Sequence, residues 1–73
     1  MTHTVLAELV AGVFKVEVTV GDQVAVGDTL VVLESMKMEI PVIVEVAGIV
    51  SELAVAEGDV ITEGDTIAVI TAH

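Results

Sequence analysis

The chain has 73 residues and contains no cysteine, tryptophan, tyrosine or arginine. Without cysteine, disulfides and thiolate metal sites are excluded, and a reducing compartment is consistent with the composition. Because there is only one phenylalanine, the core has to be built from aliphatic side chains. Two lysines stand against twelve acidic residues, which gives a formal net charge of −10. A chain this acidic repels phosphate backbones and anionic lipid, so we expect neither a nucleic-acid partner nor a membrane partner.

Long apolar runs are also missing. Stretches such as residues 40–44 are far shorter than the roughly twenty residues that a membrane span requires. The first residues show no basic and then apolar leader. We therefore expect a single cytoplasmic domain over residues 1–73. A domain of this size buries only about 60% of its unfolded surface, which leaves little room for an enclosed active site beside a core. This weighs against an autonomous enzyme.

The chain is instead rich in β-branched residues, with seventeen valines and six isoleucines. Such side chains suit a pleated, half-buried surface better than a helix. Val16, Val18 and Val20 alternate with polar neighbours, which is the two-residue period of a strand. The pattern predicts an all-β fold with eight strands, near residues 5–10, 12–19, 24–26, 29–35, 38–44, 47–55, 61–63 and 66–71.

An internal repeat organises these strands. Two Gly-Asp pairs recur after thirty-seven residues, Gly21-Asp22 as Gly58-Asp59 and Gly27-Asp28 as Gly64-Asp65. Ala11-Gly12 resembles Ala47-Gly48 at a spacing of thirty-six, which indicates one residue gained between these landmarks. Two copies are too few for a solenoid, so we expect two half-domains related by a pseudo-two-fold axis. Two facing sheets would remove most of the exposed strand edges.

Lys37 lies where the repeat is interrupted, between the strands expected to end at Ser35 and to begin at Met38. Only Met36 and Lys37 remain to form a turn, and two-residue hairpin turns normally use Asn-Gly because both residues take positive φ. We therefore expect a strained turn with the lysine projecting from its tip, and local strain of this kind points to function. His3 and His73 lie near the two ends of the sequence and are not expected to bind metal.

The residues around this lysine match a known motif. Glu34-Ser35-Met36-Lys37-Met38 resembles the attachment motif of biotinyl carrier domains, in which biotin is joined by an amide to the lysine between two methionines. The likeness extends to the Gly-Asp pairs and is greatest to small, free-standing biotinylated proteins of actinobacterial type. It implies a flattened antiparallel barrel-sandwich of two four-stranded sheets, with the acceptor lysine on a hairpin. The short segment 20–24 leaves no room for the protruding thumb of some relatives.

The resemblance also implies a function. Lys37 would be the biotin acceptor, Met36 and Met38 would be read by the biotin ligase and the carboxylase, and Glu34 and Ser35 would complete the attachment loop. Covalent biotin would then carry the carboxyl group, as carboxybiotin, between the biotin carboxylase and the carboxyltransferase of a biotin-dependent carboxylase. The chain would be a carrier subunit, with no catalytic residue of its own.

Two alternatives belong to other classes. Lipoyl carrier domains share the fold, but they usually have an acidic residue before the lysine, where this chain has Met36. The same repeats also occur in unmodified structural or adaptor modules, in which Lys37 would be an ordinary solvated lysine. The mass added to the protein in its host separates the three.

Overall fold

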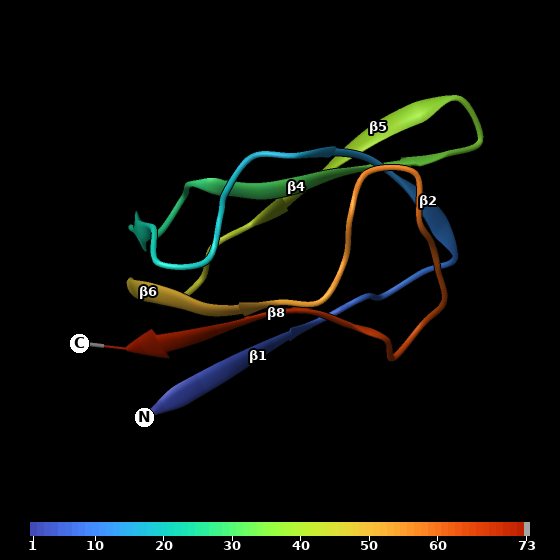
Figure 1. Ribbon diagram of the computed structural model, residues 1–73. Coiled ribbons are helices and arrows are strands. Elements are labelled where there is room, and N and C mark those ends of the chain that lie inside the picture. The colour runs from blue at the N-terminus through green and yellow to red at the C-terminus, as the bar shows by residue number, and fades with distance from the viewer. Residues whose placement is uncertain (73) are drawn as a thin grey trace.

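The computed structural model describes residues 1–72, which form eight β-strands (Figure 1). Within these residues, no helix is long and apolar enough to cross a membrane. The strands, in chain order, are β1 (Thr2–Leu6), β2 (Ala11–Val16), β3 (Gln23–Val24), β4 (Thr29–Ser35), β5 (Met38–Ile43), β6 (Gly48–Leu53), β7 (Val60–Ile61) and β8 (Thr66–Ala72).

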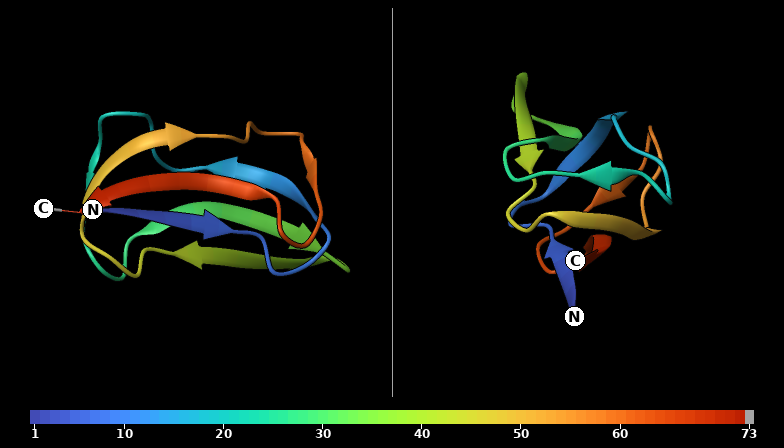
Figure 2. Two further views of the ribbon diagram at one scale, coloured as in Figure 1. Left: turned by 90° about the horizontal axis from the view of Figure 1, so that it is seen from below. Right: turned by 90° about the vertical axis from the view of Figure 1, so that its left-hand side faces the viewer.

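The strands form two antiparallel four-stranded sheets that face each other (Figures 1 and 2). One sheet has the order β1-β8-β6-β3 and the other the order β5-β4-β2-β7. The molecule is elongated, with principal extents of 35 × 19 × 17 Å. The predicted barrel-sandwich is therefore confirmed.

The two halves of the chain fold alike. Each strand of β1–β4 begins thirty-seven residues before its counterpart in β5–β8, with one exception at Thr2 and Met38, and the bulges after Val13 and Val50 share the same spacing. The inferred gain of one residue was wrong, because Ala11 and Gly48 both begin a strand as its first buried residue. Ala47, which the sequence pattern paired with Ala11, is exposed. The equivalent buried positions hold the small residues Ala11 and Gly48, and this led the sequence pattern to match Ala11-Gly12 with Ala47-Gly48.

The four Gly-Asp pairs form the turns that close the sandwich. In each turn the glycine has a φ between 92° and 98°, a region that side chains disfavour. The aspartate carboxylate accepts a hydrogen bond from the backbone N–H three residues earlier, as from Thr19 to Asp22 at 2.9 Å. The same bond forms at Asp28, Asp59 and Asp65. The aspartates thus fix their own turns, as residues that bond to nearby backbone do.

Each turn also binds to a buried residue of the other half. The backbone N–H of the glycine donates to the carbonyl of that residue, and the carbonyl of the aspartate accepts from its N–H. The four buried residues are Ala7, Val13, Val44 and Val50. The backbone groups of the turns are therefore satisfied by the other half of the chain.

The core between the sheets is aliphatic, and no polar or charged residue in the described part of the chain is buried. Leu30, Leu33, Ile67 and Ile70 are the largest of its fully buried side chains. Along β4 and β8 these residues are three apart, because Val31 and Ala68 are also buried beside Leu30 and Ile67, so the two-residue period is interrupted there.

Several strand limits differ from the prediction. The strand expected over 5–10 is β1 at Thr2–Leu6, because Ala7 leaves the ladder to bond to the carbonyl of Asp65. The strand expected over 12–19 ends at Val16, because Thr19 is held in the turn by Asp22. The strand expected over 29–35 is confirmed as β4.

Candidate functional site

The hairpin between β4 and β5 has the tight turn that the sequence predicts. Ser35 pairs with Met38, so that only Met36 and Lys37 remain in the turn. Their φ values are 53° and 65°. In the described part of the chain, they are the only residues other than glycine with a positive φ. Two successive residues at positive φ define a type I′ turn. The expected strain is confirmed, because side chains in this region cost roughly 1–2 kcal/mol per residue.

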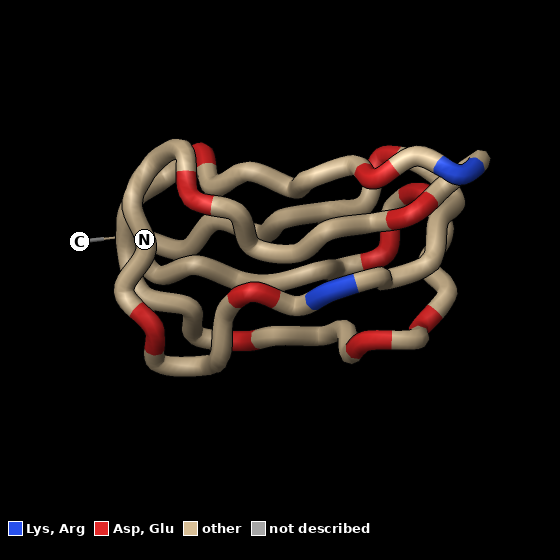
Figure 3. The backbone as a smooth tube through the Cα atoms, turned by 90° about the horizontal axis from the view of Figure 1, so that it is seen from above, with Lys and Arg blue, Asp and Glu red and all other residues tan. Residues whose placement is uncertain are grey.

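The turn lies at one end of the long axis. The hairpin extends past the neighbouring turns, and the N-terminus lies at the opposite end of the molecule (Figures 1 and 2). Lys37 is exposed, and within residues 1–72 it makes no hydrogen bond or ion pair. Acidic segments are spread along the chain, whereas lysine occurs at only two places (Figure 3). The single amine at the tip is therefore open to an approaching enzyme.

The other residues predicted for the site surround this amine. Met36 and Met38 are 90% and 59% exposed, although methionine is normally a buried residue. Flexible, polarizable methionines suit a surface that different partners contact. Ser35 is half-buried at the end of β4, and Glu34 is exposed one residue before it. The structure thus brings all five predicted residues together on one hairpin.

Sequence reasoning missed what supports the turn. Leu33 is buried, and it pairs with the half-buried Ile40 two steps below the tip. Between that pair and the turn, Glu34 pairs with Glu39, and both are exposed. Like charges directly opposite each other destabilise a sheet. The alternation along β4 and β5 was the signal that could have revealed both pairs.

The remaining candidates for chemistry lie elsewhere. Lys15 is exposed on β2, with its Nζ 3.7 Å from a carboxylate oxygen of Glu17. The hydroxyl of Ser51 donates to the backbone carbonyl of Val69. Among residues 1–72, no three histidine, aspartate or glutamate side chains are grouped to hold a metal ion. His73 lies outside the described residues.

The geometry of the hairpin suits the attachment of an acyl group. Because Lys37 is exposed, its amine is not activated by burial in an apolar pocket. It can form an amide only with an acyl group that another enzyme has already activated. Its four methylene groups and the turn hold the amine away from both sheets, so the body of the domain does not obstruct a catalytic cleft.

Comparison with known proteins identifies the family. Residues 2–70 match the biotin/lipoyl attachment family, described as a biotin-requiring enzyme. The chain belongs to this family. Covalently attached biotin is accordingly its cofactor, and the domain is a carrier rather than a catalyst. An exposed, unpaired lysine amine on the hairpin is a group to which such a cofactor can be joined.

Individual relatives agree with this assignment. The chain is 63% identical over 41 residues to a protein of Mycolicibacterium smegmatis named a homolog of the biotinylated protein TB7.3, a match that spans 56% of this chain and 58% of that protein. Two solved structures share the fold of the biotin/lipoyl domain. A single-chain, multi-domain long-chain acyl-CoA carboxylase has a TM-score of 0.92 and 30% identity, over 99% of this chain and 7% of the carboxylase. The urea carboxylase of Kluyveromyces lactis has a TM-score of 0.89 and 31% identity, over 97% of this chain and 6% of the carboxylase.

Proposed function

We propose that Lys37 is the residue to which biotin is attached, and that the domain carries it between the active sites of a carboxylase. The observation that carries this proposal is the turn itself. Lys37 is exposed at the tip of the hairpin, at a φ of 65°, between two exposed methionines. A strained turn that exposes three side chains costs stability, and such costs persist where function requires them.

In this role the chain acts by position. The two sheets and their four bonded turns form a stiff body, and Lys37 provides a flexible arm at its end. The bound cofactor supplies the carboxyl-transfer chemistry, and the protein supplies binding and orientation. Tethering raises the local concentration of the attached group to the millimolar range, so that a new binding event is not required at each active site.

The proposed partners follow from the two chemical steps that such a carrier requires. A biotin protein ligase would supply the activated acyl group to Lys37, and would read Met36 and Met38 beside it. Glu34 and Ser35 would complete the loop that enters the ligase. A biotin carboxylase and a carboxyltransferase would then use the attached group in turn, in the cytoplasm. The similarity to domains of two carboxylases, at 30% and 31% identity, supports this choice of partners.

The test uses the only two lysines of the chain. The wild type, Lys37→Arg and Lys15→Arg would be incubated with biotin, ATP and a biotin protein ligase, and analysed by intact mass and streptavidin capture. Both variants keep the charge of the chain, so they differ only in which amine is missing. We expect the wild type and Lys15→Arg to gain one biotinyl group, and Lys37→Arg to gain none. Because amide formation removes one positive charge, the formal net charge of the wild type changes from −10 to −11, and it migrates faster on a native gel.

Three results would contradict the proposal. Capture of Lys37→Arg by streptavidin would place the attachment at another amine. A wild-type chain isolated from its host without any added mass would favour the unmodified adaptor module, and the mass of a lipoyl group would favour the lipoyl carrier.

A further inference from the structure

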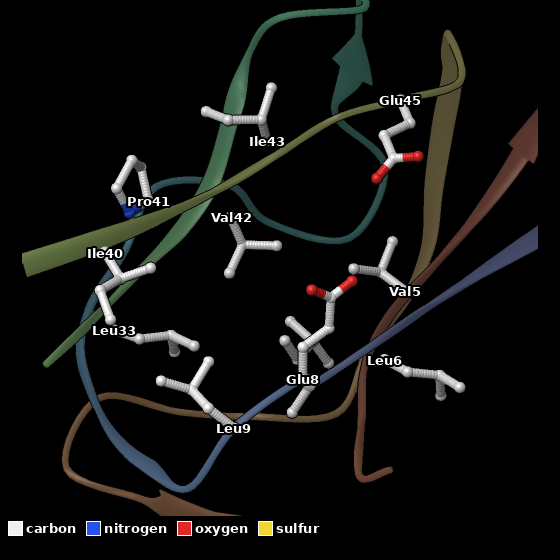
Figure 4. Close-up of a pocket in the computed structure, with 12 residues that line it drawn as sticks. Val5, Leu6, Glu8, Leu9, Leu33, Ile40, Pro41, Val42, Ile43 and Glu45 are labelled. Carbon is white, nitrogen blue, oxygen red and sulfur yellow. The ribbon is translucent and has the colours of Figure 1, made fainter. Parts of the chain in front are cut away.

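A groove of about 250 Å³ runs along the seam where the two sheets meet at their edge strands, β1 and β5 (Figure 4). Its floor is apolar and includes Val5 and Val42, which are counterparts in the two halves of the chain, whereas their neighbours Leu6 and Ile43 line it with exposed side chains. Leu33 and Ile40 also line it, and they form the pair that supports the lysine hairpin. The groove therefore begins beside the base of that hairpin.

Two carboxylates stand beside this apolar floor. Glu8 and Glu45 are thirty-seven residues apart, and both line the groove with their carboxyl groups turned toward its interior (Figure 4). Within residues 1–72, neither makes a hydrogen bond or an ion pair. Two unpaired like charges over aliphatic side chains are complementary to a lysine or arginine, which has an aliphatic stem and a cationic head.

Only one of the two edge strands at the seam can pair with a further strand. Along an antiparallel ladder, hydrogen-bonded pairs alternate with non-hydrogen-bonded pairs. The N–H of Ala72 donates to the carbonyl of Met1, which makes Met1 and Ala72 a hydrogen-bonded pair, so the pair of Thr4 with Val69, three steps further on, is a non-hydrogen-bonded one. The N–H of Thr4 therefore points away from β8. The counterpart of Thr4 in the other half is Pro41, which has no N–H. A proline on an edge strand prevents the addition of another strand. The edge of β5 is thus protected, and the edge of β1 is free to pair.

The occupant that fits these features is an extended, basic segment of another protein. A second copy of this chain is unsuitable, because each copy has a net charge of −10 and only two lysines. We propose that the groove binds an extended segment of the biotin ligase, with a lysine or arginine between aliphatic residues, along the free edge of β1. This inference rests on the proposed attachment of biotin to Lys37, since an enzyme that encloses the hairpin also reaches Leu33 and Ile40.

The first test removes the two charges. Biotinylation of Glu8→Gln/Glu45→Gln would be followed by intact mass at increasing carrier concentration, beside Glu52→Gln/Glu63→Gln as the control. The control residues are exposed, do not line the groove and change the net charge equally. We expect KM for the groove variant to rise about ten-fold while kcat stays unchanged, because lost charge complementarity weakens association and not the chemical step. The control should show a smaller rise, from the loss of overall charge alone.

The second test blocks the edge. Thr4→Pro removes the outward N–H, as Pro41 does naturally at the equivalent position, whereas Thr4→Ala keeps it. We expect Thr4→Pro to raise KM several-fold and Thr4→Ala to match the wild type, with thermal unfolding used to verify that both variants are folded. Equal KM values for the groove variant and its charge control would overturn the inference while the proposed function stands. If the ligase does not modify the wild-type chain, both the proposed function and this inference are contradicted.

Discussion

Glu34 of β4 lies directly opposite Glu39 of β5, one step below the turn that presents Lys37. Ser35 and Met38 close the two-residue turn, so the Glu34–Glu39 pair is one of the non-hydrogen-bonded pairs, in which the side chains come closest. Both carboxylates are exposed, and in the described part of the chain no cation pairs with either. The hairpin therefore combines a strained turn with a repulsive pair.

Removing this repulsion should stabilise the protein. We expect Glu39→Gln to raise the free energy of unfolding by roughly 0.2–1 kcal/mol, because like charges opposite each other are destabilising by about that amount. The measurement is chemical denaturation at low ionic strength. Glu63→Gln is the control, since it removes the same charge from an exposed residue outside any strand. A gain no larger than that of the control would show that the facing carboxylates do not repel measurably.

The turn should show the same conflict between stability and function. Met36→Asn/Lys37→Gly introduces the pair that a type I′ turn favours, and we expect it to raise the free energy of unfolding by about 1–2 kcal/mol. It also removes the amine, so biotinylation should be lost. Lys37→Ala is the matched control, because it loses the amine but keeps a side chain at positive φ. Equal stability of the two variants would mean that the turn is not strained.

Much of the fold could be predicted from the sequence because its signals are local. Alternating valines predict strands, and Gly-Asp pairs predict turns whose glycines have positive φ. The end of β1 could not be predicted, since it depends on a backbone bond to the other half of the chain. Ala7 leaves its strand for the carbonyl of Asp65, which is distant in sequence. The repeat was misaligned at Ala11 for a similar reason, because burial is set by the tertiary fold.

The candidate site was predictable in its residues but not in its surroundings. Met36 and Lys37 stand in a segment too short for any other connection, and this indicated their geometry in advance. The groove between β1 and β5 gave no such signal. Glu8 and Glu45 are single acidic residues in an acidic chain, and only the approach of two edge strands brings them to one seam.

Gly48 should be the glycine least able to accept a side chain. A Cβ at this position would overlap the carbonyl oxygen of Thr71 and lie 2.9 Å from the Cα of Ala72, both of them backbone atoms. We expect Gly48→Ala to lower the free energy of unfolding by about 3 kcal/mol or more, the upper range of overpacking costs. Thermal or chemical unfolding measures the change.

Gly12 provides the comparison, because it lies in β2, the counterpart of β6. A Cβ there would meet no atom closer than the backbone oxygen of Asp59 at 3.9 Å. Gly12→Ala should therefore change the free energy of unfolding by less than about 1 kcal/mol. If both variants lose the same stability, the close approach of β8 to Gly48 is not what requires glycine.

The two methionines should matter for recognition and not for stability. Met36→Ala and Met38→Ala truncate side chains that are 90% and 59% exposed, so each should change the free energy of unfolding by no more than about 0.5 kcal/mol. Biotinylation by the ligase should nevertheless slow, because these side chains flank the amine that must enter its active site. Val60→Ala is the control, since Val60 is also apolar and 76% exposed, and lies on β7. Unfolding curves and initial rates of mass addition would be measured for all three. Rates that equal the wild-type rate in both methionine variants would show that the ligase reads the fold and the lysine without them.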